Sequence, residues 1–352
     1  MYPALAVLDS LQNLEPENLQ TLWVGGEGGM EAELVQRRQI PYAAIPAAGV
    51  HGVGLRTLPK NLSQLAQGVL ESRKILREFK PDTLFFTGGY VAVPMAIAGW
   101  RIPSLLFVPD IEPGLALKSL AWGAAKITTS TPNSAAYFSR PERIIPTGYP
   151  TRPDLATWER DAARKTLGLD AEKPVLLVFG GSKGARSIND ALIANLPALL
   201  ERTQIVHISG KLDWQKVQNA RNALKREQAQ NYRVFDYLHE EMGAALAAAD
   251  LVVSRAGAST LGEFPLFGLP ALLVPYPYAW RYQKVNAEYL EEKGAAEMIK
   301  DEDLTEQLLP RVDALLGDPQ KLAAMRQAMK NLARPQAADD IAAELLALAG
   351  KR

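Results

Sequence analysis

Short apolar runs alternate with longer amphipathic stretches along most of the chain, a rhythm typical of α/β proteins with parallel sheets. The runs are continuous in Leu, Val and Ile, which predicts strands covered by helices on both faces, as in a doubly wound sheet. We predict strands at residues 21–24, 83–87, 104–108, 126–129, 175–179, 205–209, 232–235, 251–254 and 271–275. We predict helices at residues 5–14, 31–38, 62–79, 188–201, 214–227, 243–249 and 284–293.

The rhythm occurs twice, on either side of a proline-rich stretch. Three prolines and a glycine stand between residues 146 and 153, and a polar helix and a new buried strand follow. Proline density without a strand pattern is typical of a hinge between domains. The sequence therefore predicts two Rossmann-like domains, 1–150 and 151–335, with an amphipathic helix at about 336–352 that packs back on the first.

The chain opens on a helical pattern at residues 5–14, with no strand before it. In a doubly wound sheet the first strand lies near the centre, and the loop after it binds the ligand. The absence of this strand predicts a first sheet that is split in two. We expect the sequence to begin downstream of its natural start, and a domain that is built differently is the alternative.

Composition narrows the class of protein. The 352 residues include 39 basic and 39 acidic side chains, a balance that argues against a general nucleic-acid binder. Zero cysteines exclude disulfides, zinc–thiolate sites and a thiol nucleophile. His51, His207 and His239 lie far apart, so a histidine-rich metal site is not expected, and core or surface roles are favoured for the last two. No apolar run approaches ~18–20 residues and no signal-peptide pattern occurs, which predicts a soluble, cytoplasmic protein.

Three predicted strands are followed by glycine-containing loops that lead into helices, at residues 87–90, 180–185 and 255–260. Glycine permits a tight turn and exposes backbone N–H groups at a helix N-terminus, where the helix dipole favours an anion. Taken singly, each loop could equally be no more than a tight turn. Neither a P-loop nor the Gly-x-Gly-x-x-Gly fingerprint of nicotinamide enzymes follows any of these strands.

The third loop suggests what kind of anion is bound. Glu263 stands three residues after Thr260, about one turn into the predicted helix. A carboxylate there can accept hydrogen bonds from two adjacent sugar hydroxyls while the loop amides hold a phosphate. This pattern favours a nucleotide-sugar, and the alternative for Glu263 is an acid that only compensates the helix dipole.

Six segments carry a resemblance to a known family: residues 2–6, 29–35, 87–91, 180–186 and 254–260, and Gln283 with Asn286 and Ala287. Together they resemble the nucleotide-sugar glycosyltransferases of the GT-B class, most closely the MurG family, over nearly the whole chain. The resemblance implies two Rossmann-like domains facing each other across a cleft. It also implies an inverting enzyme that moves N-acetylglucosamine from UDP-N-acetylglucosamine to an undecaprenyl-diphosphate-linked muramoyl pentapeptide, the step from lipid I to lipid II in peptidoglycan synthesis.

The resemblance assigns site residues and partners. It implies acceptor binding by the first domain, donor binding by the second, no cofactor, and a peripheral location on the inner face of the cytoplasmic membrane. The positions that match donor contacts are Arg152, Ser182, Leu238, Ala258, Ser259, Thr260, Leu261, Gly262, Glu263 and Gln283. Of these, Ser182 matches a diphosphate contact, Leu238 a backbone contact to uracil, and Gln283 an amide that holds the sugar hydroxyls. The positions that match an acceptor-diphosphate loop are Gly88, Gly89 and Tyr90.

Departures from the family pattern fall mainly on the catalytic side. A glycine-rich loop that ends in a histidine, the family's candidate base, has no counterpart before Tyr2. Residues 107–110 read Phe-Val-Pro-Asp where the family has His-Glu-Gln-Asn, so that Asp110 stands in place of an asparagine. Asp110 becomes the candidate general base, Glu112 a weaker one, and a helix N-cap is the alternative for Asp110. His51 lies in a loop that the resemblance places near the same cleft.

Several alternatives stay open. No Asp-x-Asp metal motif follows a strand, so we expect donor binding without a divalent ion. The predicted helix 62–79 carries apolar residues beside Arg73, Lys74 and Arg77, a pattern that suits an anionic membrane surface or an ordinary core helix with a basic outer face. The changed segment 107–110 also allows a related transferase that acts on diacylglycerol or a lipopolysaccharide precursor. The missing loop allows a donor-binding protein without catalysis.

Overall fold

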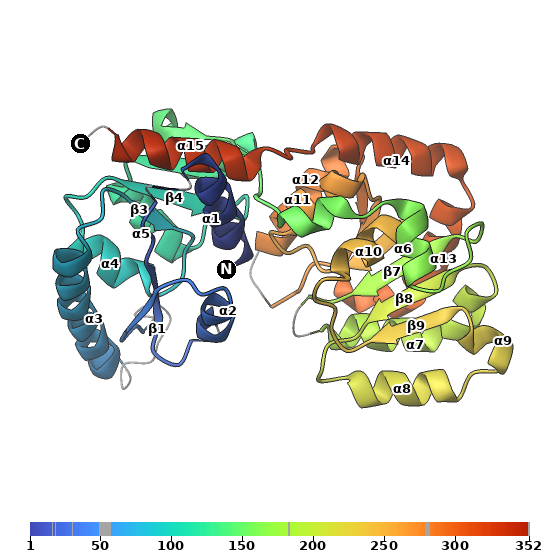
Figure 1. Cartoon of the computed structure of the whole chain (residues 1–352). Helices are drawn as coiled ribbons and strands as arrows, with labels where there is room; N and C mark the ends of the chain where they lie inside the picture. The colour runs from blue at the N-terminus through green and yellow to red at the C-terminus, as the bar shows by residue number, and fades with distance from the viewer. Residues whose placement is uncertain are drawn as a thin grey trace. The chain divides into compact units, whose positions relative to one another are not determined.

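The computed structural model describes residues 1–15, 17, 19–29, 31–48, 58–181, 184–278 and 282–350. The chain divides into two compact units (Figure 1). Unit 1 comprises Met1–Pro150 and Gln336–Arg352, and unit 2 comprises Thr151–Pro335. All strand pairs of the described chain are parallel, so the predicted α/β class is confirmed.

Unit 2 contains one continuous six-stranded sheet in the order β12-β11-β10-β7-β8-β9. Its strands are β7 (Val175–Phe179), β8 (Gln204–Ile208), β9 (Tyr232–Phe235), β10 (Leu251–Ser254), β11 (Ala271–Leu273) and β12 (Ala296–Met298). Its helices are α6 (Arg160–Thr166), α7 (Arg186–Leu200), α8 (Trp214–Asn222), α9 (Arg226–Ala229), α10 (Met242–Ala248), α11 (Thr260–Phe267), α12 (Tyr282–Glu292), α13 (Leu304–Leu316) and α14 (Pro319–Asn331). Two 3₁₀ segments, Pro153–Thr157 and Asp301–Asp303, complete it.

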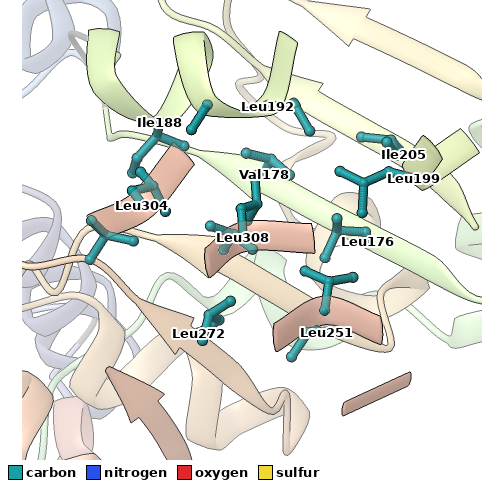
Figure 2. Close-up of a cluster of buried hydrophobic side chains, with 14 of the residues drawn as sticks. Leu176, Val178, Ile188, Leu192, Leu199, Ile205, Leu251, Leu272, Leu304 and Leu308 are labelled. Atoms are coloured by element: carbon teal, nitrogen blue, oxygen red, sulfur yellow. The ribbon is translucent and has the colours of Figure 1, made fainter. Parts of the chain in front are cut away.

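One apolar cluster holds the sheet of unit 2 against α7 and α13. Figure 2 shows Leu176, Val178, Ile188, Leu192, Leu199, Ile205, Leu251, Leu272, Leu304 and Leu308, all buried. Burying a leucine side chain contributes about 1.5–3 kcal/mol to folding. Because strands and helices share this core, the loops at the carboxyl edge of the sheet start from a rigid base.

Unit 1 is built on two separate sheets. A two-stranded sheet pairs β1 (Trp23–Gly26) with β2 (Tyr42–Ile45), and a four-stranded sheet has the order β3 (Leu84–Phe86), β4 (Ser104–Val108), β5 (Lys126–Thr129) and β6 (Ile144–Ile145). In the part of the chain that the structure describes, β1 and β3 do not pair, so the predicted split of the first sheet is confirmed. A cavity of about 800 Å³ is lined by Trp23 and Val24 of β1 and by Leu84 of β3.

Helices cover both sheets of unit 1. They are α1 (Tyr2–Leu14), α2 (Glu31–Arg37), α3 (Leu58–Phe79), α4 (Ala92–Ala98), α5 (Leu115–Gly123) and α15 (Ala337–Ala349), with 3₁₀ segments at Pro132–Tyr137 and Pro141–Arg143. The C-terminal helix α15 packs on α1 and β4. The Ser10 hydroxyl donates to Asp339, and Lys126 pairs with Glu344, so that both long-range contacts hold α15 on this unit.

The predicted elements differ from the structure at short strands, and the helices α13 and α14, of 13 residues each, were not among those predicted. The strands β2, β6 and β12 were not predicted, and each has two to four residues. The single helix predicted at 214–227 is two helices, α8 and α9, with a break at residues 223–225. Val217, Ala220 and Leu224 keep a helical spacing into the break, which explains why one helix was predicted.

Candidate functional site

The centre of the unit 2 sheet is a topological switch point. From β7 the chain continues to β8 and β9 on one side, and from β10 it continues to β11 and β12 on the other. Loops that leave adjacent strands in opposite directions open a crevice at the carboxyl ends, where α/β sheets bind their ligands. Phe179 of β7 is in register with Ser254 of β10, so the two glycine loops begin side by side.

The loop after β7 follows a path that only glycine permits. Gly181 and Gly184 have φ values of +89° and +78°, and a Cβ on Gly184 would lie 2.2 Å from the carbonyl oxygen of Ser209. The loop therefore passes closely over the end of β8 before α7 begins. Ser182, to which the resemblance assigns a diphosphate contact, lies outside the described residues, and its role stays a prediction.

The loop after β10 is fixed from both ends. The Thr260 hydroxyl donates to the Gly257 carbonyl at 2.7 Å, and the amide of buried Asn286 donates to the Ala256 carbonyl at 3.1 Å. Within the described chain, the N–H groups of residues 257–259 do not donate to a backbone carbonyl. An α-helix start with such N–H groups is suited to bind a phosphate.

Glu263 lies one turn into α11, next to this loop. Its backbone N–H donates to the Ser259 carbonyl at 2.8 Å. Burial raises the pKa of the Glu263 carboxyl to about 7, although its hydrogen bond with Ser259 and the charge of Arg152 act in the opposite direction. Burial raises the pKa of carboxyls at structural and at functional positions alike, so the ribose-binding role of Glu263 stays a prediction.

Arg152 brings two further segments to the same edge. Its Nη2 donates to the His239 carbonyl at 3.1 Å, and its Nε lies 3.6 Å from Asp154. The charge of Arg152 also acts on Glu263. Leu238, which is 8% exposed, precedes His239, so its loop, Arg152 and the start of α11 are held together.

Gln283 stands in the first turn of α12, after β11. Its Oε1 accepts a hydrogen bond from the backbone N–H of Tyr276 at 2.9 Å. This contact fixes the orientation of the side-chain amide, because only the oxygen can accept from an N–H. The NH₂ group is left as the donating end of the side chain.

The sequence assigned no role to Arg255, which proves central to this edge. The Arg255 side chain is 10% exposed, and its guanidinium pairs with Asp301. The guanidinium also donates to the Ser187 hydroxyl at 2.7 Å and to the Val274 carbonyl at 3.0 Å. Its charge also lies 5.2 Å from the ring centre of Tyr276. Arg255 thus joins the start of α7, the loop after β10 and the end of β11. A basic residue directly before a glycine loop was the signal available in the sequence.

The acceptor-side residues lie in unit 1. Gly88 and Gly89 have φ values of +101° and +86°, and Tyr90 is 61% exposed, all between β3 and α4. Asp110 lies half-buried in the loop between β4 and α5. Because α5 begins at Leu115 with Gly114 as its N-cap, the N-cap alternative for Asp110 is wrong. His51 lies outside the described residues.

The apolar side of α3 faces the protein. Ile75 and Leu76 pack against the core of unit 1, which supports the interpretation of residues 62–79 as a core helix with a basic outer face. Leu62 and Leu70 are exposed on the same helix. None of the described helices combines the length and apolar composition needed to cross a bilayer. The described residues also include no cluster of three or more metal-ligating side chains.

Comparison with known proteins gives the family. The family models for the glycosyltransferase family 28 N-terminal and C-terminal domains match residues 1–129 and 175–341. The chain is 40% identical to the UDP-N-acetylglucosamine–N-acetylmuramyl-(pentapeptide) pyrophosphoryl-undecaprenol N-acetylglucosamine transferase of Desulforudis audaxviator, over 100% of this chain and 96% of the relative. It is 39% identical to the transferase of the same name from a Roseiflexus species, over 91% of this chain and 82% of the relative.

A solved structure agrees with these relatives. The crystal structure of Acinetobacter baumannii MurG has a TM-score of 0.75 and 26% sequence identity to this chain, and the match covers 98% of this chain and 95% of that one. The parallel α/β fold in two domains is the GT-B fold that the sequence predicted. The chain therefore belongs to glycosyltransferase family 28 and, within it, to the MurG family of UDP-N-acetylglucosamine-dependent N-acetylglucosamine transferases.

Proposed function

We propose that this chain transfers N-acetylglucosamine from UDP-N-acetylglucosamine to an N-acetylmuramyl-(pentapeptide) pyrophosphoryl-undecaprenol acceptor, converting lipid I into lipid II. The names of the relatives supply the reaction. In this chain the proposal rests on one observation. The register of β7 with β10 starts two glycine loops side by side at a switch point, with Glu263 one turn behind the second loop.

Unit 2 holds the donor in this proposal. The loop before α7, including Ser182, and the segment from Ala258 to Gly262 bind the diphosphate, Glu263 accepts hydrogen bonds from the ribose hydroxyls, and the Leu238 backbone pairs with uracil. Arg152 supports the uracil loop, and the Gln283 amide donates to the sugar. Amide groups fixed before the reaction stabilise the charge that develops on the leaving UDP without reorganising.

Unit 1 holds the acceptor, and its Gly88–Gly89–Tyr90 loop binds the acceptor diphosphate. The acceptor hydroxyl displaces UDP from the anomeric carbon through an oxocarbenium-like state and inverts that carbon. A base that removes the hydroxyl proton contributes a factor of ~10²–10⁴. We assign this role to Asp110, so Asp110→Asn is expected to lower kcat by about 10²-fold and leave the KM for the donor unchanged.

The proposed donor grip uses no metal. We expect UDP affinity to be the same in an excess of EDTA and in an excess of Mg²⁺, each at about 5 mM, which would saturate a site of ordinary affinity. Fixed N–H groups at two helix starts supply the positive potential that a divalent ion provides in other transferases. A loss of affinity on chelation would show that the diphosphate needs a cation.

We infer that unit 1 works at the inner face of the cytoplasmic membrane, because the proposed acceptor is linked to undecaprenol. Trp100 and Trp122 are each 73% exposed, after α4 and near the end of α5, and Arg101 lies over the ring of Trp100. Aromatic side chains with neighbouring cations are typical of membrane–water interfaces. We expect Trp100→Ser with Trp122→Ser to reduce sedimentation with phosphatidylglycerol vesicles, and Leu212→Ser, an equally exposed site in unit 2, to leave it unchanged.

Two measurements test the function. Calorimetry should detect UDP binding to the intact chain, and an absence of heat at millimolar UDP would overturn the donor site. Radiolabelled UDP-N-acetylglucosamine should then be offered with lipid I, diacylglycerol and a lipopolysaccharide precursor. Label in lipid II alone supports the proposal, and label in another lipid identifies a different acceptor. Donor binding without any transfer identifies a binding protein.

A further inference from the structure

A chain of buried hydrogen bonds lies under the start of α7. His207 of β8 is fully buried; its Nδ1 lies 2.7 Å from the Tyr232 hydroxyl and its Nε2 2.9 Å from the Asn189 Oδ1. The Asn189 amide nitrogen donates to the Ser209 carbonyl at 3.0 Å and to Asp213 at 2.9 Å. We call His207, Tyr232, Asn189 and Asp213 the buried relay.

Only one arrangement of protons satisfies the relay. Both N–H groups of the Asn189 amide are used by acceptors, so its oxygen must accept from the His207 Nε2–H. The His207 Nδ1 then accepts from the Tyr232 hydroxyl. Burial lowers the pKa of His207 to about 3, which keeps the ring neutral and the arrangement unchanged at ordinary pH.

The relay links two parts of the proposed donor site. Asn189 lies in the first turn of α7, and its backbone N–H donates to the Ala185 carbonyl at 2.9 Å, directly after the diphosphate loop. Gly184 of that loop packs against the same Ser209 carbonyl that accepts from Asn189. At the other end, Tyr232 opens β9, the strand that leads to Leu238.

An ordinary role in core packing does not account for this arrangement. Polar groups without water cost stability unless every one is paired, and apolar side chains would fill the same space without that requirement. The relay is paired through its own members and the Ser209 carbonyl, and it runs from Tyr232 at the start of β9 to Asn189 and Asp213 at the carboxyl edge. We propose that His207 is a positioning residue that, through Asn189, sets the diphosphate loop relative to the uracil segment; this inference rests on the proposed donor site.

A matched pair of substitutions tests the proposal. His207→Gln keeps a donor for Asn189 and an acceptor for Tyr232, whereas His207→Met fills the space and removes both. We expect His207→Met to weaken UDP binding about tenfold, the effect of leaving one buried polar group unpaired. Uridine lacks the diphosphate, so its binding should change less than twofold. His207→Gln should stay within about threefold of the original protein for both ligands.

Gln204→Met is the control for stability. Gln204 is buried on the same strand, at the opposite edge of the sheet, where it bonds to the backbone of Asp170. It should lower stability without changing the ratio of UDP to uridine affinity. If His207→Met does not fold, Tyr232→Phe should lower the same ratio to a smaller extent, because the bond from His207 to Asn189 remains.

The outcomes separate the two proposals. Calorimetry of the unsubstituted protein comes first, and the absence of UDP binding there would overturn the donor site itself. If that protein binds UDP and His207→Met leaves the ratio of UDP to uridine affinity unchanged, the positioning role of His207 is wrong. An equal loss of affinity for both ligands would contradict that role as well.

Discussion

The two units share one architectural plan but differ in the continuity of their sheets. In unit 2 the hydrogen-bonded ladder runs unbroken from β12 to β9, with β7 and β10 at its centre. Among the described residues of unit 1 the ladder is interrupted between β1 and β3, and a cavity of about 800 Å³ adjoins both strands. A continuous ladder fixes the positions of all the loops at its carboxyl edge relative to one another. A divided ladder fixes only the loops that belong to the same part.

This difference accounts for how well each half of the site is defined. In unit 2 the structure brings Arg152, the Leu238 loop, Glu263 and Gln283 to one edge. In unit 1 the Gly88–Gly89 turn and Asp110 follow β3 and β4 of the four-stranded sheet, whereas the turn at Gly28 follows β1 of the other. We therefore expect unit 2 to hold the donor-binding residues in place through its own fold.

The largest expected effect comes from two buried arginines at opposite edges of the unit 2 sheet. Arg255 joins the loops of the carboxyl edge, and Arg164, 2% exposed, pairs with Asp250 at 2.7 Å and donates to the Ala248 carbonyl at the other edge. Replacing either by Met leaves buried acceptors unpaired, so each should lower the free energy of unfolding by about 3 kcal/mol. Only Arg255→Met should also weaken UDP binding, by at least about tenfold.

Denaturant unfolding and calorimetry with each variant check this pair. Arg164→Met is the matched control, since it removes a paired guanidinium that is even more deeply buried and far from the glycine loops. Equal UDP affinities in the two variants would mean that the carboxyl edge does not depend on Arg255. A small effect of both on stability would mean that the sheet of unit 2 is not held in the way we describe.

Hydrogen exchange tests the comparison of the units directly. A two-stranded sheet is marginally stable by itself, so the amides of Val24 and Gly25 in β1 should open more easily than those of Leu177 and Val178 in β7. We expect about 30-fold faster exchange in β1, equivalent to about 2 kcal/mol. Mass spectrometry of peptides that cover each strand gives the rates. Equal protection would show that the division of the unit 1 sheet has no energetic consequence.

Much of this difference could be predicted from the sequence, because it depends on local pattern. Continuous apolar runs predicted β7, β8, β9 and β10 within one residue of their bounds, and the helical opening without a strand predicted the divided sheet. The strands β2 and β12 were missed, because runs of three or four residues with a polar or small member are too short to show a period.

The missed contacts depend on the third dimension. Arg255 is one residue from a glycine loop in the sequence, yet its partners Ser187, Val274 and Asp301 come from three other segments. His207 lies in an apolar run, and the sequence favoured a core or surface role for it. Its partners Asn189 and Tyr232 are known only once β8, α7 and β9 are placed. Local periodicity carries no information on such pairings.

A pH dependence distinguishes the donor site of unit 2 from a neutral pocket. Burial raises the pKa of Glu263 to about 7, and the ribose hydroxyls are expected to bind the ionised carboxylate. The affinity for UDP-N-acetylglucosamine should therefore fall as the pH drops, by about tenfold between pH 8 and pH 6, or about 1.4 kcal/mol. This ligand has no phosphate group that titrates in the same range, and calorimetry across the range gives the profile.

Glu263→Gln is the control, and it also predicts an effect on stability. The folded pKa lies above the unfolded value, so the folded state binds more protons between the two values, and stability falls as the pH rises from about 4.5 to about 7. Glu263→Gln should remove this fall and flatten the affinity profile at a weaker level. A profile in the variant that matches the original protein would assign the titration to another group.

The smallest expected effect concerns the sugar. The Gln283 Oε1 accepts from the Tyr276 N–H, so Gln283→Glu retains that acceptor, removes the two donors and adds a negative charge. We expect the preference for UDP-N-acetylglucosamine over UDP-glucose, which carries the same charge, to fall about fivefold, or about 1 kcal/mol. Gln283→Ala also leaves the Tyr276 N–H unpaired and should weaken the binding of UDP-N-acetylglucosamine, UDP-glucose and UDP alike. Competition titration gives these ratios, and unchanged discrimination in both variants would show that unit 2 selects the sugar by other groups.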